Sequence, residues 1–184
     1  MAVTFNTMKV RFNFPKIFEA NQKSGKYELT VLIPKDDTET KRRLVEAAKT
    51  LYEEEKNSAF RGLNFDEVAK PYHDGDGRKP KGGAYGEECK GMIVLNARSK
   101  NKPKVYNADK SECTDATRVY SGCYGRVNIS LYAYNNESGR GIGCGINGVM
   151  TFNYGDALGG STVTASTWDD GFTDDGNMDD DLGL

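Results

Sequence analysis

The chain has 184 residues, of which 37% are hydrophobic and 28% charged, with a formal net charge of −2. This composition predicts one domain of ordinary size with enough apolar residues for a core. No apolar run approaches the roughly 18 residues of a membrane-spanning helix, and the N-terminal segment alternates where a signal peptide would be continuously apolar. We therefore expect a cytoplasmic protein.

The charge is unevenly distributed along the chain. Eight of the 27 acidic residues lie beyond Arg140, where there is no Lys or Arg, so the preceding body has 25 basic residues against 19 acidic ones. A basic body favours a nucleic-acid partner more than the net charge suggests. The last segment is rich in Gly, Ser, Thr and Asp, which is typical of a disordered tail. We predict a folded domain over residues 1–154 and a flexible acidic tail over residues 155–184.

The cysteines and the histidine form no metal-binding motif. Cys89, Cys113, Cys123 and Cys144 include no pair at CxxC spacing, and His73 is the only histidine. Structural zinc sites use closely spaced ligand pairs, and disulfides are rare in a reducing cytoplasm. We therefore expect no metal, no cofactor and four reduced cysteines.

Alternation of apolar and polar residues predicts strands over residues 3–14 and 26–33. Between 37 and 56, apolar residues recur at helical spacing, which predicts a helix with one buried face. The apolar face of the first strand is expected to consist of Met8, Val10, Phe12 and Phe14.

Residues 57–90 are expected to be irregular and include the Gly-rich stretch DGDGRKPKGGAYGEE. It carries Arg78, Lys79 and Lys81, and is either a mobile flap over a bound strand or an insertion with no role. Residues 92–100 predict another strand, with apolar side chains facing inward. Its outward residues and the turn that follows form a basic edge: Arg98, Lys100, Lys102 and Lys104.

The stretch TRVYSGCYGRVNISLYAY, residues 117–134, predicts a strand with two distinct faces. Its odd positions are apolar and predict a core face. Its even positions interleave cations with aromatic rings, and the candidates on this basic aromatic face are Arg118, Tyr120, Tyr124, Arg126, Tyr132 and Tyr134.

Such a face suits a single-stranded nucleic acid. Side chains two residues apart on a strand are roughly 6.6–6.8 Å apart, a spacing comparable with that of extended bases. Aromatic rings stack on bases of any sequence, and guanidinium groups follow the phosphates. The alternative is that the tyrosines pack against a second sheet or a helix, with their hydroxyls at the rim.

Residues 135–139 predict a hairpin turn, and residues 140–154 a final strand. This strand contains GxGxxG, but a dinucleotide site needs a strand before that motif and a helix after it. We expect these glycines to permit barrel curvature or the close approach of another backbone. One face of the strand is expected to contain Ile142, Cys144, Ile146, Met150 and Phe152.

The segments KVRFNFPKIFEA, GKYELTVLIPK and VYSGCYGRVNISLYAY, with the Gly-rich strand that follows, resemble a family of bacteriophage single-stranded DNA-binding proteins with an OB-fold. The resemblance covers about residues 8–154. It implies a mainly β fold, a five-stranded Greek-key barrel with an inserted helix and long loops. It also implies sequence-independent binding of single-stranded DNA in phage replication, recombination or repair, in the cytoplasm of the host cell. The oligomeric state stays open, a homo-oligomer included.

The tail extends this resemblance. Its tip, MDDDLGL, resembles the acidic tips by which such proteins recruit replication and recombination enzymes, although it lacks the terminal phenylalanine of the bacterial pattern. The resemblance implies partner binding through Trp168, Phe172, Asp179, Asp180, Asp181, Leu182 and Leu184.

Two other classes of function compete with this interpretation. A structural β-barrel protein that assembles a phage particle would not need a basic aromatic face. A nuclease would need carboxylates clustered on rigid elements to hold metal ions, whereas the acidic residues here lie on a helix face, in a Gly-rich loop and in the tail. We therefore expect a binding protein and not an enzyme.

Overall fold

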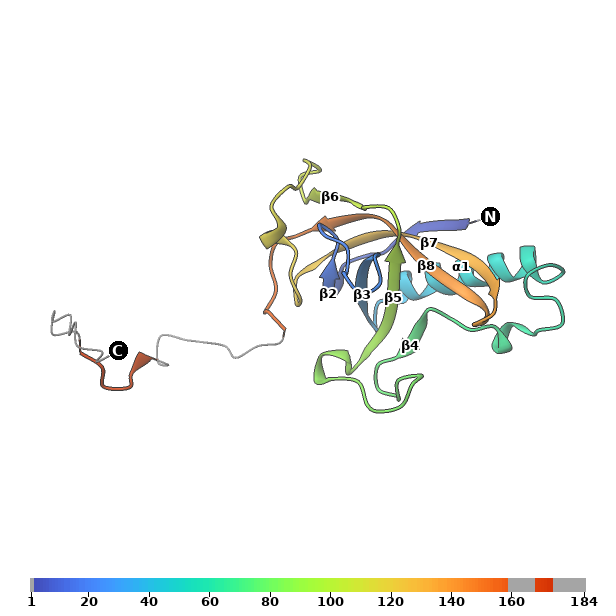
Figure 1. The fold of residues 1–184 in the computed structure, drawn as a ribbon, viewed down its shortest axis with the longest axis horizontal. Coiled ribbons are helices and arrows are strands. Elements are labelled where there is room, and N and C mark those ends of the chain that lie inside the picture. The colour runs from blue at the N-terminus through green and yellow to red at the C-terminus, as the bar shows by residue number, and fades with distance from the viewer. Residues whose placement is uncertain (1, 159–167, 174–184) are drawn as a thin grey trace, which may run out of the picture.

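The computed structural model describes residues 2–158 and 168–173. Within them, one α-helix, α1 (Thr38–Glu55), and three short 3₁₀ helices accompany a single eight-stranded sheet (Figure 1). The 3₁₀ helices are η1 (Phe65–Glu67), η2 (Glu87–Cys89) and η3 (Ala116–Arg118). The strands are β1 (Ala2–Asn6), β2 (Val10–Lys16), β3 (Tyr27–Pro34), β4 (Tyr72–Asp74), β5 (Met92–Ser99), β6 (Lys104–Asn107), β7 (Tyr124–Asn136) and β8 (Gly139–Thr151).

The strands follow the order β4-β5-β3-β2-β7-β8-β6, and β1 pairs with the later part of β7. All pairs are antiparallel except that of β6 with β8. The sheet curls until β5 approaches β8, since a Cβ atom at Gly145 would lie 3.8 Å from the carbonyl oxygen of Arg98. The mainly β, OB-fold-like architecture is confirmed, but with eight strands in place of five. The predicted first strand is divided into β1 and β2, and short strands β4 and β6 form in segments expected to be irregular or a turn.

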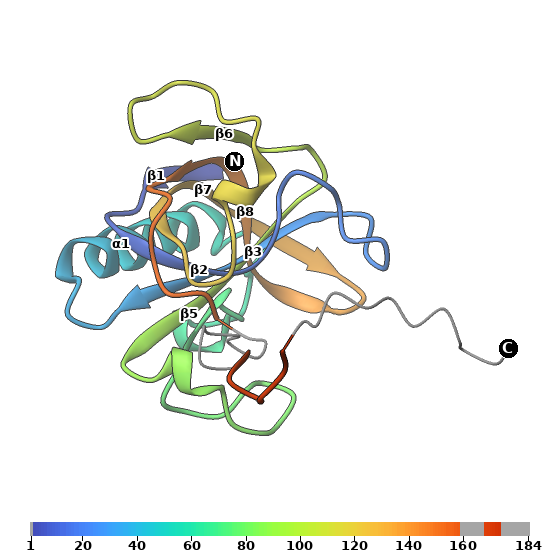
Figure 2. The same cartoon turned by 90° about the vertical axis from the view of Figure 1, so that its left-hand side faces the viewer.

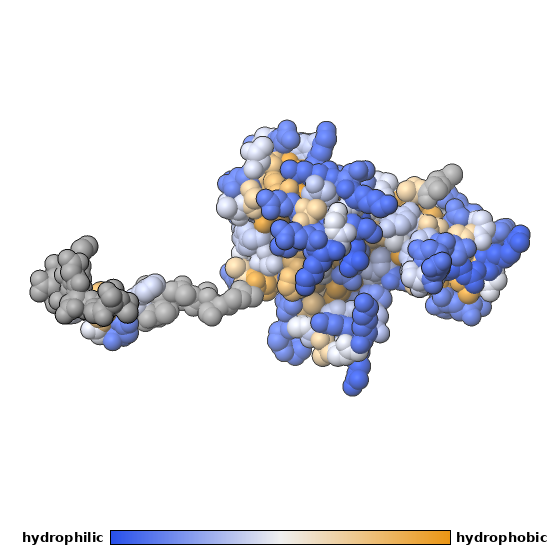
Figure 3. All heavy atoms as spheres, in the orientation of Figure 1, coloured by the Kyte–Doolittle hydropathy of each residue, from blue (hydrophilic) through white to orange (hydrophobic). Residues whose placement is uncertain are grey.

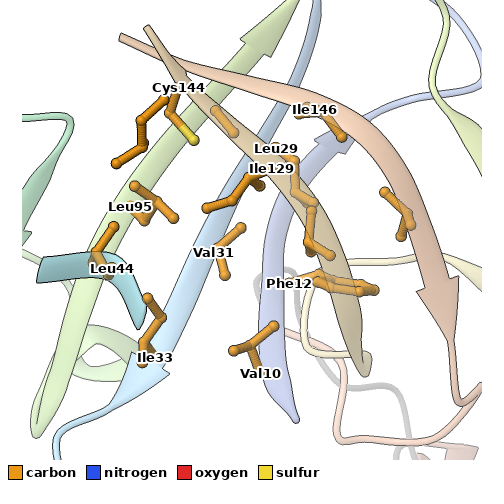
Figure 4. Packing of buried hydrophobic residues seen from close by; sticks show 14 of the residues in the cluster. Val10, Phe12, Leu29, Val31, Ile33, Leu44, Leu95, Ile129, Cys144 and Ile146 are labelled. Carbon is orange, nitrogen blue, oxygen red and sulfur yellow. The ribbon is translucent and has the colours of Figure 1, made fainter. Parts of the chain in front are cut away.

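The inner face of the curled sheet encloses the main core (Figure 4). Val10 and Phe12 of β2, Val31 of β3, Leu95 of β5 and Ile129 of β7 are all fully buried there. Helix α1 closes the core with the apolar face predicted for it, through Leu44, Ala47, Ala48 and Leu51. No helix in the described part of the chain is both long and apolar enough to cross a membrane.

The predicted strand 3–14 breaks at Thr7, which is fully buried. Its hydroxyl accepts a hydrogen bond from the backbone N–H of Val127 at 3.0 Å, and its own N–H donates to the Val127 carbonyl at 2.9 Å. The following N–H, that of Met8, donates to the Thr40 hydroxyl of α1 at 2.9 Å. These bonds turn the chain, so Met8 lies at the surface and not in the core as predicted.

Phe14 also lies outside the core, contrary to its predicted face. The pairing of β2 with β3 shifts by one residue between Asn13 and Lys16, which is a β-bulge. Phe14 adopts a φ of 48°, and its side chain is 68% exposed. Because one extra residue reverses the alternation of faces, Phe12 points inward and Phe14 points outward.

A second bulge reverses the faces of β8. Ile129 pairs with Ile146, whereas the preceding Asn128 pairs with Gly148, so Asn147 is the extra residue. Beyond it, Val149 is buried and Met150 faces outward, as does Phe152 further on. The prediction that Met150 and Phe152 share the core face of Ile142 and Cys144 is therefore wrong.

Residues 117–134 do not form one strand. Their first part is η3 and a loop, and β7 begins only at Tyr124. Gly122 in this loop has a φ of 105°, and a Cβ atom there would lie 2.0 Å from the carbonyl oxygen of Asp156. The close contact with the segment after β8 therefore excludes a regular strand here.

The Gly-rich loop, residues 75–91, packs on the outer face of the sheet. Cys89 forms a second, smaller apolar cluster with Leu32 of β3 and Val94 of β5. At the base of the loop, the ammonium group of Lys35 contacts the carboxylates of Asp74 at 2.6 Å and Asp76 at 2.5 Å. The loop is therefore attached to the sheet at its base and through this cluster. Figure 2 shows its backbone below β5.

Phe12 and Phe14 allow a matched test of the bulge in β2. Phe12→Ala should lower the free energy of unfolding by about 3–5 kcal/mol, because it leaves a cavity in a close-packed core. Phe14→Ala removes the same atoms from an exposed position and should leave stability nearly unchanged. Urea denaturation of both variants checks this. Equal losses would place both rings in the core and contradict the bulge.

Candidate nucleic-acid interface

A basic hollow of about 310 Å³ lies where β5 meets the β7–β8 hairpin. Arg98 and Lys100 lie at its β5 side, and Tyr132 of β7 provides an aromatic ring. The guanidinium of Arg98 is 3.4 Å from the Glu28 carboxylate of β3, which holds it at the rim. The complete lining of this basic hollow is Lys26, Arg98, Ser99, Lys100, Tyr132 and Gly145. The structure thus brings together three residues predicted on two separate strands.

The glycines of β8 position the tyrosine rings of β7. A Cβ atom at Gly143 would lie 2.4 Å from the Tyr132 ring, and one at Gly141 would lie 2.5 Å from the Tyr134 hydroxyl. Each ring therefore lies over a glycine on the neighbouring strand. Of the glycines in the GxGxxG motif, Gly143 is approached by a side chain, whereas Gly145 and Gly148 lie nearest the backbone carbonyl oxygens of Arg98 and Lys104, as expected. Tyr132 remains 42% exposed, so its outer surface is available for stacking.

A second group of rings and cations lies at the start of β7. We call it the tyrosine–cation cluster, and it consists of Lys9, Arg11, Tyr124, Phe152 and Tyr154. The Tyr124 and Tyr154 ring centroids are 5.4 Å apart. The Lys9 ammonium lies 5.4 Å from the Tyr124 centroid and donates to the Tyr154 hydroxyl at 2.9 Å. The Arg11 guanidinium carbon lies 5.5 Å from the Tyr124 centroid.

Sequence reasoning missed four members of this cluster. Lys9 and Arg11 occupy the polar face of the predicted first strand, so the alternation could have indicated that they are exposed cations. The pairing of Arg11 with Tyr124 across β2 and β7, however, joins residues more than a hundred positions apart and has no local signature. Phe152 and Tyr154 were missed because the bulge at Asn147 reverses their faces.

The other candidates are dispersed. The Arg126 Nε donates to the Thr7 carbonyl at 2.8 Å, on the same face of β7 as Tyr124 and Tyr132. Lys102 and Lys104 line a separate hollow, where the Lys102 ammonium is 5.9 Å from the Phe18 ring.

Arg118 and Tyr120 do not belong to the predicted face. Arg118 lies in η3, and its Nε is buried with no hydrogen-bond partner among the described residues. Tyr120 lies in the loop before β7 and donates its hydroxyl to the Gly155 carbonyl at 2.8 Å. It therefore holds the segment after β8 and is not on a strand.

The tail is described only in part. Trp168 and Phe172 are 73% and 79% exposed, as a contact surface for a partner would require. The other tail candidates, Asp179, Asp180, Asp181, Leu182 and Leu184, lie outside the described residues.

The titratable side chains of the described residues offer little that could serve catalysis. No three His, Cys, Asp or Glu side chains in residues 2–158 and 168–173 are grouped to hold a metal ion. Burial raises the pKa of the Cys144 thiol to about 12 and lowers the pKa of half-buried His73 on β4. What the described site offers is aromatic surface and positive charge.

A model of the family described as the single-stranded DNA-binding protein of Enterobacter phage Enc34 matches residues 3–182. The chain belongs to this family. Protein p50 of Acyrthosiphon pisum secondary endosymbiont phage 1 is 30% identical over 172 residues, 88% of this chain and 90% of that protein.

Two solved structures of the Enc34 protein share the fold. The C-terminal truncation has a TM-score of 0.71 at 25% identity, covering 84% of this chain and 88% of that one. The complex with single-stranded DNA has a TM-score of 0.70 at 24% identity, covering 85% and 89%. The family resemblance inferred from the sequence is thus confirmed. Because the family is one of DNA-binding proteins, it also agrees with the expectation that the chain is not an enzyme.

The tyrosine–cation cluster makes a prediction about pH. The hydrogen bond to the Tyr154 hydroxyl raises the pKa of Lys9 above its ordinary value of 10.5. The bond therefore stabilises the fold below that pH and is lost as the pH rises through the raised value. In Tyr154→Phe, the Lys9 pKa should fall toward 10.5. An NMR titration of the Lys9 side chain measures this, with Lys35, held by Asp74 and Asp76, as the unaffected control. An unchanged Lys9 pKa would exclude the bond.

Proposed function

We propose that this protein binds single-stranded DNA without sequence preference, in phage DNA replication, recombination or repair in the cytoplasm of the host cell. The observation that carries the proposal is the basic hollow, where Arg98, Lys100 and the exposed ring of Tyr132 meet on one surface. A member of the same family has been solved in complex with single-stranded DNA, which supports the proposal. A particle-assembly protein would have no use for this combination.

Binding would begin with charge and continue with stacking. Cations such as Lys100 and Arg98 release counterions from the phosphate chain, which gives a salt-dependent attraction. Bases would then stack on Tyr132 and, at the other end of β7, on Tyr124 and Tyr154, each stack contributing about 1–3 kcal/mol. Ring faces do not contact the hydrogen-bonding edges of the bases, so the affinity should depend little on sequence.

In this proposal, residues 1–154 bind DNA and residues 155–184 recruit partner proteins. A titration of fluorescently labelled oligo-dT, with a duplex of equal length as competitor, tests the DNA-binding part. We expect preference for the single strand, because stacking needs unpaired bases. Equal affinity for the duplex, or none for either DNA, would contradict the proposed function.

Arg98 provides a quantitative prediction for this titration. Arg98→Ala should weaken oligo-dT binding. It should also reduce the steepness of the plot of log affinity against log salt concentration by a fraction of a unit, because each neutralised phosphate contributes about −0.7 to that slope for single strands. Arg42→Ala is the matched control, since Arg42 is similarly exposed and also paired with a carboxylate, but lies on α1 away from the basic hollow. A slope that changes equally in both variants would mean a general effect of charge.

We further propose that the acidic tail competes with DNA and recruits replication or recombination proteins. The support is the position of its first residues, because the backbone after β8 runs beside β2 and the loop before β7 (Figure 2). The Arg11 guanidinium donates to the Asp156 carbonyl at 2.7 Å, and the Leu158 N–H donates to the Ser121 carbonyl at 2.8 Å. The eight acidic residues beyond Arg140 therefore begin within reach of the proposed interface.

Deletion of residues 167–184 should raise the affinity for oligo-dT, most at low salt, because screening weakens the competition at physiological ionic strength, where the Debye length is about 8 Å. Thermal stability should stay close to that of the full chain. Fluorescence titration and thermal denaturation measure the two effects. A truncated protein that binds more weakly or melts earlier would make the tail part of the fold.

A further inference from the structure

A second hollow, of about 570 Å³, lies between the outer face of the sheet and the Gly-rich loop. We call it the loop pocket. Asn13, Thr30 and Asn96 line it from β2, β3 and β5, and the loop contributes Lys79 and Tyr85. Its volume falls in the range of about 300–1,000 Å³ that is usual for small-ligand sites. Figure 3 shows hydrophobic residues among hydrophilic ones at the surface of this part of the molecule.

Phe14 lines this pocket in a costly conformation. A bulky residue at a φ of 48° is a backbone outlier, and such strain persists mainly where function requires it. Two hydrogen bonds from the Phe14 N–H hold it, to the Asn13 Oδ1 at 3.1 Å and to the Ser121 Oγ at 2.9 Å. The bonds fix a large apolar ring that is 68% exposed, which suggests that a ligand covers it.

The remaining lining fits one nucleotide. Phe14 and Tyr85 provide aromatic surface, and the Lys79 ammonium lies 5.8 Å from the Tyr85 centroid. Lys79 and Lys81 are exposed and suited to phosphates. Every base has at least one N–H group on its Watson–Crick edge, so the Glu88 carboxylate, 3.4 Å from the Asn13 amide nitrogen, can accept a hydrogen bond from any base, thymine included.

We propose that the loop pocket binds one base of single-stranded DNA, stacked on Phe14, with Lys79 and Lys81 at the neighbouring phosphates. The inference rests on the proposed function and extends its surface. Asn96, Arg98 and Lys100 occupy successive outward positions along β5 and beyond its end. The first lines the loop pocket and the other two line the basic hollow, so one extended strand can reach both.

The acidic tail is the competing occupant, because Leu158 packs beside Cys89 and Val94 at the wall of the pocket. Two observations favour the base. Trp168 and Phe172 are exposed and not seated in the pocket. The Glu88 carboxylate would also repel the aspartates of the tail, whereas it pairs favourably with a base.

The test is an oligo-dT titration of three full-length variants. Phe14→Ala should weaken binding roughly 5- to 150-fold, the loss of one stack. Phe14→Tyr keeps a ring and should retain most of the affinity. Met8→Ala removes an exposed apolar side chain that lines neither hollow and should bind like the unaltered protein. A photo-reactive thymidine in the oligonucleotide should crosslink to Phe14 or to residues 79–89.

Tyr132→Ala separates this inference from the proposed function. If it weakens binding while Phe14→Ala does not, the loop pocket is not a base site and the proposed function stands. If the unaltered protein does not bind oligo-dT, the proposed function itself fails. Trp168 is the chain's only tryptophan, so its emission reports on the tail. A red shift of that emission in DNA-free Phe14→Ala would show the tail in the pocket and overturn the inference.

Discussion

The ladder between β7 and β8 is the constraint on which the rest of the structure depends. It joins two strands of 13 residues each, and its two faces have different tasks. The inner face places Val127, Ile129 and Leu131 in the core, while the outer face presents Tyr132. Because β8 has a glycine opposite Tyr132, the ring can lie on the sheet without displacing the strand. A slip of one residue would exchange the two faces and remove the core and the interface together.

Hydrophobic periodicity predicted the parts of the fold in which it runs without interruption, with period two along the strands and helical spacing along α1. The inward residues of β3, the inward Leu95 and Ala97 of β5, and the apolar face of α1 lie where the pattern placed them. The predictions failed at Thr7, Phe14 and Asn147, where a break or a bulge interrupts the count. Each interruption depends on partners far away in the sequence, such as the bonds of Thr7 to Val127, and no local pattern encodes them.

The candidate interface likewise contains residues that the sequence pattern could predict and residues whose positions depend on distant partners. Arg98 and Tyr132 could be predicted because each lies on the outer face of a regular strand, and Lys100 because it continues the outward positions of β5 just beyond its end. The tyrosine–cation cluster could not, since it forms only when β2 pairs with β7 and the segment after β8 folds back. Tyr120 was predicted on the basic aromatic face because its sequence continues the alternating pattern. The close contact of Gly122 with Asp156 instead makes this segment a loop.

The partners of the cations explain where the body can attract phosphates. On α1, Arg42 and Arg43 share the Glu39 carboxylate, so much of their charge is already compensated. Arg11 instead donates to the carbonyl oxygens of Gly122 and Asp156, and Lys9 to a tyrosine hydroxyl. Within the described residues neither forms an ion pair, so neutral groups fix their positions and leave their positive charge uncompensated. A phosphate reaching the tyrosine–cation cluster therefore meets oriented cations without first breaking a salt bridge, and the backbone of the acidic tail's first residues is what orients Arg11.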